Sequence, residues 1–381
     1  MKTRVGVIFG GRSGEHEISI RSAKSVIEQI DKEKYLVIPI AIDRGGVWLD
    51  PQTSLSLLPA RTAELIEGDL ADISCRAAAL IADPRYRGLK DLSSTALPES
   101  VYRLDVVFPV LHGTFGEDGT IQGLLDMADL PYVGCGVLAS ACGMDKVLMK
   151  ALFRDAGLPI CRHVWLLRRD FESDPTAVTA RVANIIGYPC FAKPANLGSS
   201  VGVSRASNSD ELHRAIALAA EYDRKIIIEE AVKMREIECA VLGNDDPVAS
   251  LPGEYVIRNT EKAFLDYTEK YAATGNNEFI VPAPVSSELA EKIRQMAVAA
   301  FKAIDGSGLA RVDFFLRTDN GALLVNEINT MPGLTDLSGY PKMWAGSGKP
   351  FTEVIDELIS FAIERHKDRA RNKTTLNELN Q

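Results

Sequence analysis

A chain of 381 residues is long enough for two or three domains, and 46% hydrophobic with 25% charged residues is typical of a globular protein with a sizeable core. The net charge of −9 argues against a nucleic-acid-binding protein, but it allows an anionic substrate held by local lysines and arginines. No run reaches the roughly 20 apolar residues that cross a bilayer, and the N-terminal apolar run is too short for a signal peptide. Six cysteines without metal-ligand spacing are expected to be reduced thiols. We therefore expect a cytoplasmic protein.

The first third of the chain has an α/β pattern. An apolar run over residues 5–9 ends at two glycines, and a helical pattern follows, for which Ser19 is a candidate N-cap. A second strand is expected over residues 36–42, which completes a βαβ unit and predicts a parallel sheet. Residues 50–100 are polar and irregular, so short helices and surface segments are expected there. A third strand is expected over residues 106–111.

The remaining elements alternate and then become rich in strands. Helices are expected from near Ile121 and over residues 140–155, the second stopped by Gly157. Further strands and helices follow, and their expected ranges are 163–167, 190–193, 201–204, 225–229 and 236–242 for strands, and 176–186, 210–222, 288–304 and 351–365 for helices.

The most informative polar pattern lies in two apolar runs, residues 309–316 and 323–329, joined by the turn signal Asp319-Asn320-Gly321. Side chains alternate faces along a strand. A three-residue loop with Gly321 in the left-handed conformation therefore gathers four polar groups on one face, whereas a two-residue loop would shift the pairing by one. The expected pairs are Asp313 with Glu327 and Arg311 with Asn329.

Two carboxylates and an amide oxygen suit a hard cation with oxygen ligands, for which Mg²⁺ shared with substrate phosphates is the usual case. Asp313, Glu327 and Asn329 are thus candidate metal ligands. A solvated polar face on an amphipathic hairpin is the alternative, and the hairpin alone leaves it open.

A second candidate site is the small-residue loop of residues 194–202, which follows Lys193 at a strand end. Small residues let backbone N–H groups approach phosphate oxygens closely. The spacing is not that of a Walker A motif, and a plain flexible hairpin is the alternative. Residues 134–139 formally fit the G-x-G-x-x-A dinucleotide pattern, but a tight helix entry explains them better, which disfavours a dehydrogenase. Lys146 is a candidate phosphate-binding residue only if its side chain points to the same bound phosphates as Lys193; a lone lysine on a helix is otherwise usually a surface residue.

Seven motifs stand out along the chain: residues 10–19 (GGRSGEHEIS), His112-Gly113 with 116–119 (GEDG), 144–146 (MDK), Lys193-Pro194 with 198–202 (GSSVG), Asp266-Tyr267 with Lys270-Tyr271, Arg311-Val312-Asp313, and 327–333 (EINTMPG). Together they resemble the D-alanine–D-alanine ligases of the ATP-grasp superfamily, in that family's order and from about residue 3 to 345. The resemblance implies an α/β protein, α+β in its C-terminal part, with an ATP-grasp fold. It also implies an N-terminal domain (1–140), a central subdomain (141–232) and a C-terminal subdomain with lid and metal site (233–381).

The implied reaction has two steps. The carboxylate of one D-alanine attacks the γ-phosphate of ATP to give an acyl phosphate and ADP, and the amine of a second D-alanine then displaces phosphate, giving a peptidoglycan precursor. The resemblance assigns two Mg²⁺, with Mn²⁺ as a substitute, to Asp313, Glu327 and Asn329, and an oxyanion-stabilising role to Arg311 and Gly333. It assigns nucleotide contacts to Lys146, Lys193, Ser200, Glu229, Glu230, Val232, Glu236 and Asn326.

For the amino-acid substrates the resemblance assigns Glu15 to the first ammonium, within a hydrogen-bonded chain Glu15–Ser199–Tyr271 that closes the lid of residues 258–275. Lys270 and Ser338 would receive the second carboxylate. His112 would line the site, or it is a structural histidine. Gly339 would lie in the substrate site, although many relatives carry a larger apolar residue there.

Two alternatives of different kinds remain. One is another ATP-grasp carboxylate–amine ligase, including a ligase that takes D-lactate or D-serine as its second substrate; Tyr271 favours dipeptide formation. The other is a non-catalytic ATP-binding regulator, against which the joint presence of Arg311, Asp313, Glu327 and Asn329 argues. A homodimer is carried over from the family alone.

Overall fold

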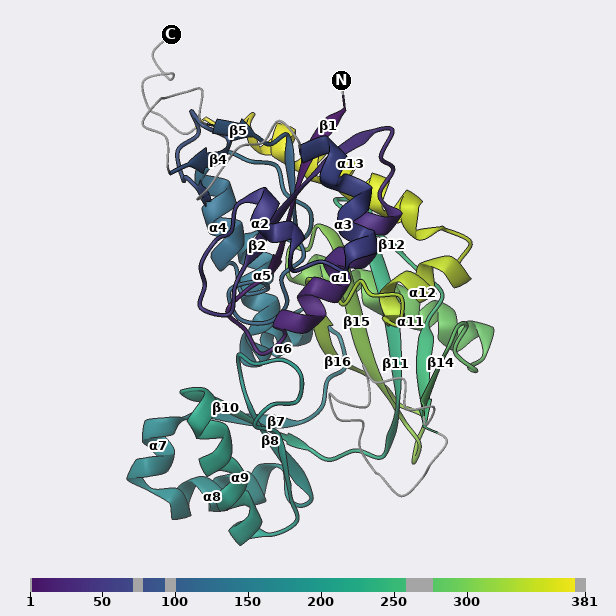
Figure 1. Ribbon diagram of the computed structural model, residues 1–381. Helices are drawn as coiled ribbons and strands as arrows, with labels where there is room; N and C mark the ends of the chain where they lie inside the picture. The colour runs from purple at the N-terminus through teal and green to yellow at the C-terminus, as the bar shows by residue number, and fades with distance from the viewer. Residues whose placement is uncertain (1, 71–77, 93–100, 258–276, 374–381) are drawn as a thin grey trace.

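A computed structural model describes residues 2–70, 78–92, 101–257 and 277–373. Four sheets lie within these ranges. Figure 1 shows a small lobe built from β7, β8 and β10 with helices α7, α8 and α9, set apart from a larger body that contains the N-terminal elements and the sheet of β11 and β14–β16. The mixed α/β class expected from the sequence is confirmed.

The N-terminal sheet is parallel with the order β2-β1-β6, as the βαβ pattern predicts. Ser19 is not the N-cap of the first helix, so that expectation is wrong: the helix begins at His16 after Glu15. The buried Ser19 hydroxyl instead accepts from Gly10 N (2.8 Å) and donates to Val110 O, because these groups at two strand ends would otherwise be unpaired. The elements are β1 (Thr3–Gly10), α1 (His16–Gln29), β2 (Tyr35–Ile42) and β6 (Val106–Pro109).

Short helices occur between residues 50 and 70 as expected, but a small antiparallel sheet, β3-β4-β5, was not predicted. Its strands have three or four residues, which is too short for an alternating pattern to be recognised. The elements are α2 (Pro51–Leu55), α3 (Ala60–Glu67), a 3₁₀ turn (Gly68–Leu70), β3 (Ala78–Leu80), β4 (Gly88–Asp91) and β5 (Val101–Arg103).

The single helix expected over residues 140–155 is wrong, because Asp145 divides it in two. Asp145 has extended backbone angles, and its carboxylate accepts hydrogen bonds from Val147 N (3.0 Å) and Leu148 N (3.1 Å), which starts a new helix. Lys225 forms an ion pair with the same carboxylate. The elements are α4 (Thr120–Met127), α5 (Val137–Met144) and α6 (Lys146–Asp155).

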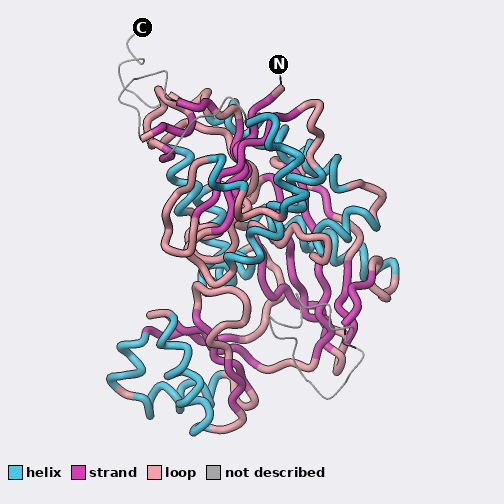
Figure 2. The backbone as a smooth tube through the Cα atoms, in the orientation of Figure 1, coloured by secondary structure: helices cyan, strands magenta, loops and turns pink. Residues whose placement is uncertain are grey.

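The small lobe is an antiparallel sheet of order β7-β10-β8-β9 with its own apolar core. Its three helices lie together on one side of this sheet (Figure 2). The strand expected over residues 201–204 is wrong at its start, since Ser199, Ser200 and Gly202 have positive φ and cannot continue a strand. The elements are β7 (His163–Leu167), α7 (Arg168–Ser173), α8 (Pro175–Ile185), β8 (Cys190–Pro194), β9 (Ser204–Ala206), α9 (Ser209–Tyr222) and β10 (Lys225–Glu230).

The C-terminal sheet has the order β14-β13-β11-β15-β16, with β12 paired to β11. Helix α13 packs against α1, β6, β11 and β15, so one core cluster contains residues from both ends of the chain, such as Val5 and Ile355. The elements are β11 (Met234–Gly243), β12 (Val248–Ala249), β13 (Gly253–Ile257), β14 (Asn277–Ile280), α11 (Ser287–Ala303), β15 (Gly308–Arg317), β16 (Leu323–Asn329), α12 (Gly339–Gly346) and α13 (Phe351–Arg369). Within the described ranges, none of the helices combines the length and apolar character that crossing a membrane requires.

Candidate active site

One cleft is lined by residues of the N-terminal unit, the small lobe and the C-terminal sheet. Most of the residues singled out in the sequence contribute to its walls: Glu15, His112, Lys146, Lys193, Ser199, Ser200, Glu236, Arg311, Asp313, Asn326, Glu327, Asn329 and Gly333. Side chains separated by more than 300 positions in the chain therefore face the same space.

The hairpin β15–β16 provides one wall, and its pairing is the predicted one: Asp313 lies opposite Glu327 and Arg311 opposite Asn329. The predicted three-residue loop is wrong. Arg317 N donates to Ala322 O, so the loop comprises residues 318–321, with Gly321 at φ +71°. A register shift next to Asp313 leaves Asn326 as an extra residue in β16, and this bulge compensates for the longer loop.

The polar groups of the hairpin are tightly interconnected. The Arg311 guanidinium contacts both Asp313 oxygens, from Nε to Oδ1 and from Nη2 to Oδ2, each at 2.6 Å. Asn329 Nδ2 also donates to Asp313 Oδ2 at 3.1 Å. Glu327 is less constrained: its Oε2 lies 3.7 Å from Lys146 Nζ and its side chain is 29% exposed. Glu327 is therefore the more accessible carboxylate of the pair.

These residues fit a divalent cation by the chemistry of their donors. Among the described residues, no group of three His, Cys, Asp or Glu side chains is arranged to hold a metal ion. The hairpin instead offers two carboxylates and one amide oxygen on one face, beside the cleft, and hard cations accept this mixture of ligands. A cation bound here would share Asp313 with Arg311.

Behind the opposite wall lies a buried charged cluster. Glu229 on β10 is 2% exposed and does not line the cleft. Its Oε2 accepts from Lys193 Nζ at 2.6 Å, and its Oε1 lies 2.8 Å from Lys150 Nζ. Burial alone would raise the pKa of Glu229, but the two lysines hold that pKa far below its usual range. Burial would likewise lower the pKa of Lys193, and Glu229 raises it above the usual value, so both groups are charged.

The loop between β8 and β9 reaches across the cleft. Ser199 and Ser200 have φ of +56° and +57°, the left-handed region that L-residues rarely adopt. Lys146 Nζ donates to Leu197 O at 2.9 Å, and Ser199 Oγ donates to Glu15 Oε1 at 2.5 Å. The first link of the expected Glu15–Ser199–Tyr271 chain is thus present. Tyr271 and Lys270, like the expected lid of residues 258–275, lie outside the described residues.

Glu15 is packed closely against backbone. A Cβ on Gly113 would come within 2.7 Å of Glu15 Oε2, and Gly113 also has φ +73°. The positive φ favours glycine here, and the absence of a Cβ lets the Glu15 carboxylate keep this position against the chain.

His112 is 4% exposed, and both its ring nitrogens have partners within the protein. Nδ1 lies 3.0 Å from Met331 O, and Nε2 lies 2.9 Å from Ser22 Oγ. Burial alone would lower the pKa of His112, but the Glu117 carboxylate 3.7 Å away raises it above the ordinary value. The pKa of Glu117 is itself raised, chiefly by burial. His112 therefore joins α1 to the loop after β16 while one side faces the cleft.

Besides Glu229, four predicted residues in the described part of the chain lie away from the cleft lining. Glu230 forms an ion pair with Arg162 (3.0 Å), and Val232 follows β10. The buried Ser338 hydroxyl lies 2.7 Å from Thr335 Oγ1. A Cβ on Gly339 would come within 2.5 Å of Glu238 Oε2 and 2.8 Å of the Phe279 ring, so a larger residue there requires these side chains to shift.

Three residues near the site were not predicted: Glu117, Glu238 and Lys150. Glu117 lies in a motif that was noticed but given no role. Glu238 shares a face of β11 with Glu236, two positions earlier, and its Oε2 lies 3.4 Å from Arg311 Nε. Lys150 lies one helical turn after Lys146 on α6, which is the signal that could have found it.

Solved structures with this fold identify the class. The chain superimposes on the D-alanine–D-alanine ligase from Coxiella burnetii with a TM-score of 0.79 and 38% identity, over 97% of this chain and 98% of that one. It matches the VanG D-Ala:D-Ser ligase from Enterococcus faecalis with the same TM-score and 34% identity, over 95% and 100% of the two chains. The fold and the site therefore define an ATP-dependent ligase with the ATP-grasp architecture.

The sequence narrows this class to one family. The families described as "D-ala D-ala ligase N-terminus" and "D-ala D-ala ligase C-terminus" match residues 4–135 and 152–360. A D-alanine–D-alanine ligase of Geobacillus thermodenitrificans is 48% identical over 97% of this chain and 98% of its own. The chain belongs to the D-alanine–D-alanine ligase family.

Proposed function

We propose that this protein joins two D-alanine molecules through a D-alanyl phosphate, converting ATP to ADP and phosphate, for peptidoglycan precursor synthesis. The observation that carries the proposal is one cleft with an acidic hairpin on one wall and Lys146, Lys193 and a small-residue loop on the other. Phosphoryl transfer depends mainly on positioning and on neutralising charge, and these walls supply both.

In the first step Lys146, Lys193 and Ser200 hold the phosphates of ATP. Asp313, Glu327 and Asn329 hold Mg²⁺, two ions in our proposal and replaceable by Mn²⁺, which neutralise charge on the phosphates when bound. Glu236 and Asn326 contact the nucleotide from the cleft wall, and Glu229, Glu230 and Val232 form the adenine end of the site. Glu15, hydrogen-bonded to Ser199, receives the ammonium of the first D-alanine beside His112.

In the second step the amine of the second D-alanine attacks the acyl carbon, and the C–O bond to phosphate breaks. Arg311 and the Gly333 N–H stabilise the oxyanion that develops on the acyl oxygen. Lys270 and Ser338 receive the second carboxylate, with Gly339 in the same substrate site, and Tyr271 completes the chain from Glu15 when the lid closes. Lid closure excludes water, which protects the acyl phosphate from hydrolysis.

We further propose a homodimer located in the cytoplasm, with the division into residues 1–140, 141–232 and 233–381 given above. The reducing state of that compartment agrees with five unpaired cysteine thiols in the described part of the chain.

The decisive assay is ADP release with D-alanine compared with L-alanine, each with Mg²⁺ and ATP. We expect release with D-alanine only, and no difference between the two would refute the proposal. Adding D-lactate or D-serine tests the second candidate function, a ligase that takes one of these as its second substrate. The structural similarity to a D-Ala:D-Ser ligase supports testing it. Tyr271→Phe should raise ester formation with D-lactate relative to dipeptide formation; an unchanged ratio would contradict the role given to Tyr271.

A further inference from the structure

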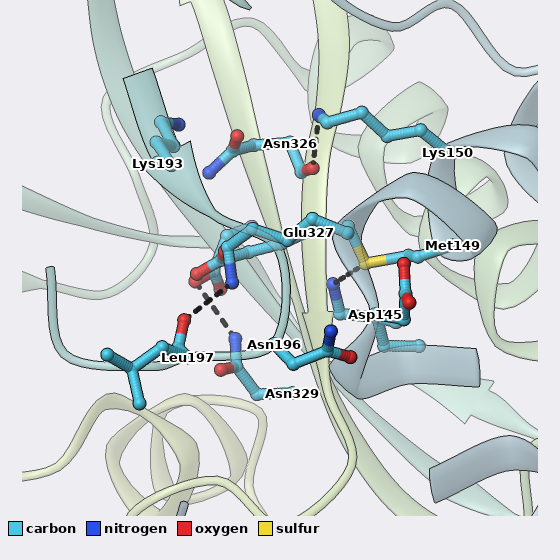
Figure 3. Close-up of polar contacts among 12 residues, drawn as sticks. Asp145, Met149, Lys150, Lys193, Asn196, Leu197, Asn326, Glu327 and Asn329 are labelled. Carbon is cyan, nitrogen blue, oxygen red and sulfur yellow. Dashed lines mark hydrogen bonds and ion pairs between the residues drawn. The ribbon is translucent and has the colours of Figure 1, made fainter. Parts of the chain in front are cut away.

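Lys150 is a lysine with no access to the cleft, although it lies in the middle of the charged site. Its side chain is 1% exposed, and it does not line the cleft. A buried ammonium is costly unless it is paired and hydrogen-bonded. Its Nζ lies 2.8 Å from Glu229 Oε1 and donates to Asn326 O at 2.9 Å. Figure 3 shows Lys150 extending from α6 to Asn326 on β16. Lys150 therefore connects two different sheets.

Its partner on β16 is the bulge of the hairpin. Asn326 is the extra residue that places Glu327 opposite Asp313. A bulged residue is left out of the strand ladder, and here the Lys150 ammonium binds its carbonyl. The preceding residue of α6 binds β16 as well, since Ile328 N donates to Met149 Sδ at 3.4 Å. Two consecutive residues of α6 thus hold the segment that presents Glu327.

Its other partner is shared with the cleft. Glu229 uses one carboxylate oxygen for Lys150 and the other for Lys193. Lys193 lines the cleft, whereas Lys150 does not. Lys150 neutralises part of the negative charge of Glu229 from the side away from the cleft. Lys193 therefore keeps part of its positive potential for an anion in the cleft. Without Lys150, Lys193 would be the one counter-ion left to the buried Glu229 carboxylate among the described residues.

We infer that Lys150 is a positioning residue for the nucleotide, acting through Glu229 on Lys193 and through the Asn326 carbonyl on Glu327. This inference rests on the proposed ATP site. It couples the phosphate-binding wall to the acidic hairpin, so replacement of one buried lysine affects both walls without changing the identity of any cleft-lining residue.

The test is Lys150→Met, which keeps the length and removes the charge. At saturating Mg²⁺ we expect the KM for ATP to rise about tenfold or more, since hydrogen bonds to charged groups contribute about 1.5–3 kcal/mol. The KM for D-alanine should stay within about twofold, and the Mg²⁺ concentration for half-maximal rate should rise. Arg154→Met, an exposed residue one turn further along α6, is the matched control and should leave all three values unchanged.

A purely structural role would lower thermal stability without raising the KM for ATP more than the KM for D-alanine. An unchanged KM for ATP in a folded Lys150→Met protein therefore overturns the inference. The second test is the same replacement in a Glu229→Gln background, where the effect on the KM for ATP should largely disappear while the effect on the Mg²⁺ requirement persists. If Lys150→Met raises the KM for ATP by the same factor in the wild-type and Glu229→Gln backgrounds, the inference is also overturned.

If Lys150→Met does not fold, Lys150→Arg and the charge-neutral pair Lys150→Gln with Glu229→Gln carry the test. The arginine variant should need less Mg²⁺ for half-maximal rate than the neutral pair, because only the arginine keeps a cation at the Asn326 carbonyl, and the opposite order would refute the inference. Failure of the wild-type protein to release ADP with D-alanine would instead reject the proposed function.

Discussion

Two charged clusters border the cleft, and they differ in burial. The buried cluster consists of Lys150, Lys193 and Glu229, whose side chains are 1%, 15% and 3% exposed. The hairpin cluster includes Arg311, Asp313 and Glu327, at 13%, 13% and 29%. Every carboxylate oxygen of the buried cluster contacts a lysine at 2.8 Å or less, whereas the contact between Glu327 and Lys146 is longer, at 3.7 Å.

The clusters also have opposite charge. Two lysines and one glutamate give the buried cluster a net positive charge, and one arginine with two carboxylates gives the hairpin cluster a net negative one. Phosphate groups suit the first and a divalent cation suits the second. The comparison teaches that the buried cluster sets the geometry of the site, while the more exposed hairpin cluster presents its carboxylates to the cleft.

The largest effect should come from the hairpin cluster. Glu327→Gln removes the accessible carboxylate and should lower kcat by about a thousandfold, because metal stabilisation of charge contributes several kcal/mol. ATP binding should persist, since the lysine wall is intact, and thermal stability should change little. Steady-state ADP release and calorimetric ATP titration measure the two properties.

Asp319→Asn is the matched control, because Asp319 lies in the loop of the same hairpin and pairs only with the exposed end of Arg317 among the contacts described (2.7 Å). It should leave kcat unchanged. Normal turnover of Glu327→Gln would remove the metal role from the hairpin cluster and with it the contrast between the two clusters.

The buried cluster should show its effect in stability. Glu229→Gln leaves two lysines without their carboxylate, and breaking a buried ion pair in this way costs about 3 kcal/mol or more of unfolding free energy. Since the folded state lowers the pKa of Glu229 from 4.5, the ionised group stabilises the fold above that value and loses its contribution as the pH falls.

The difference in unfolding free energy between wild type and Glu229→Gln should therefore be full at neutral pH and shrink below about pH 4.5. Chemical denaturation at several pH values measures it. A difference that grows on acidification would mean that Glu229 is not held as an anion.

The sequence predicted much of the hairpin cluster, because strand alternation and a turn signal are local. It predicted the opposed pairs Asp313–Glu327 and Arg311–Asn329, and these are confirmed. The loop length was wrong, and the pairing survived only because the bulge at Asn326 cancels the extra loop residue. A compensation of this kind depends on packing against α6, which no local pattern reports.

The buried cluster was only half predicted, for a different physical reason. Lys193 and Glu229 were found by resemblance to a family, whereas Lys150 looks like any surface lysine on a helix. Its burial follows from its contacts with Glu229 on β10 and Asn326 on β16, which are tertiary information. The break at Asp145 is different, because its N-cap hydrogen bonds from Val147 and Leu148 are local and an aspartate at a helix start is a recognisable signal in the sequence.

The smallest effect that we predict concerns the loop that joins the two walls. Ser199→Ala removes the hydroxyl that donates to Glu15 at 2.5 Å. A hydrogen bond to a carboxylate is worth about 1.5 kcal/mol or more, so the KM for D-alanine should rise about tenfold while the KM for ATP stays within about twofold.

The matched variant is Ser200→Ala. Ser200 has the same positive φ as Ser199 and loses the same hydroxyl, so the two variants are matched in backbone strain. Ser200→Ala should raise the KM for ATP instead. If both variants change the same constant, the loop acts as one unit, and the assignment of separate substrates to its two serines is wrong.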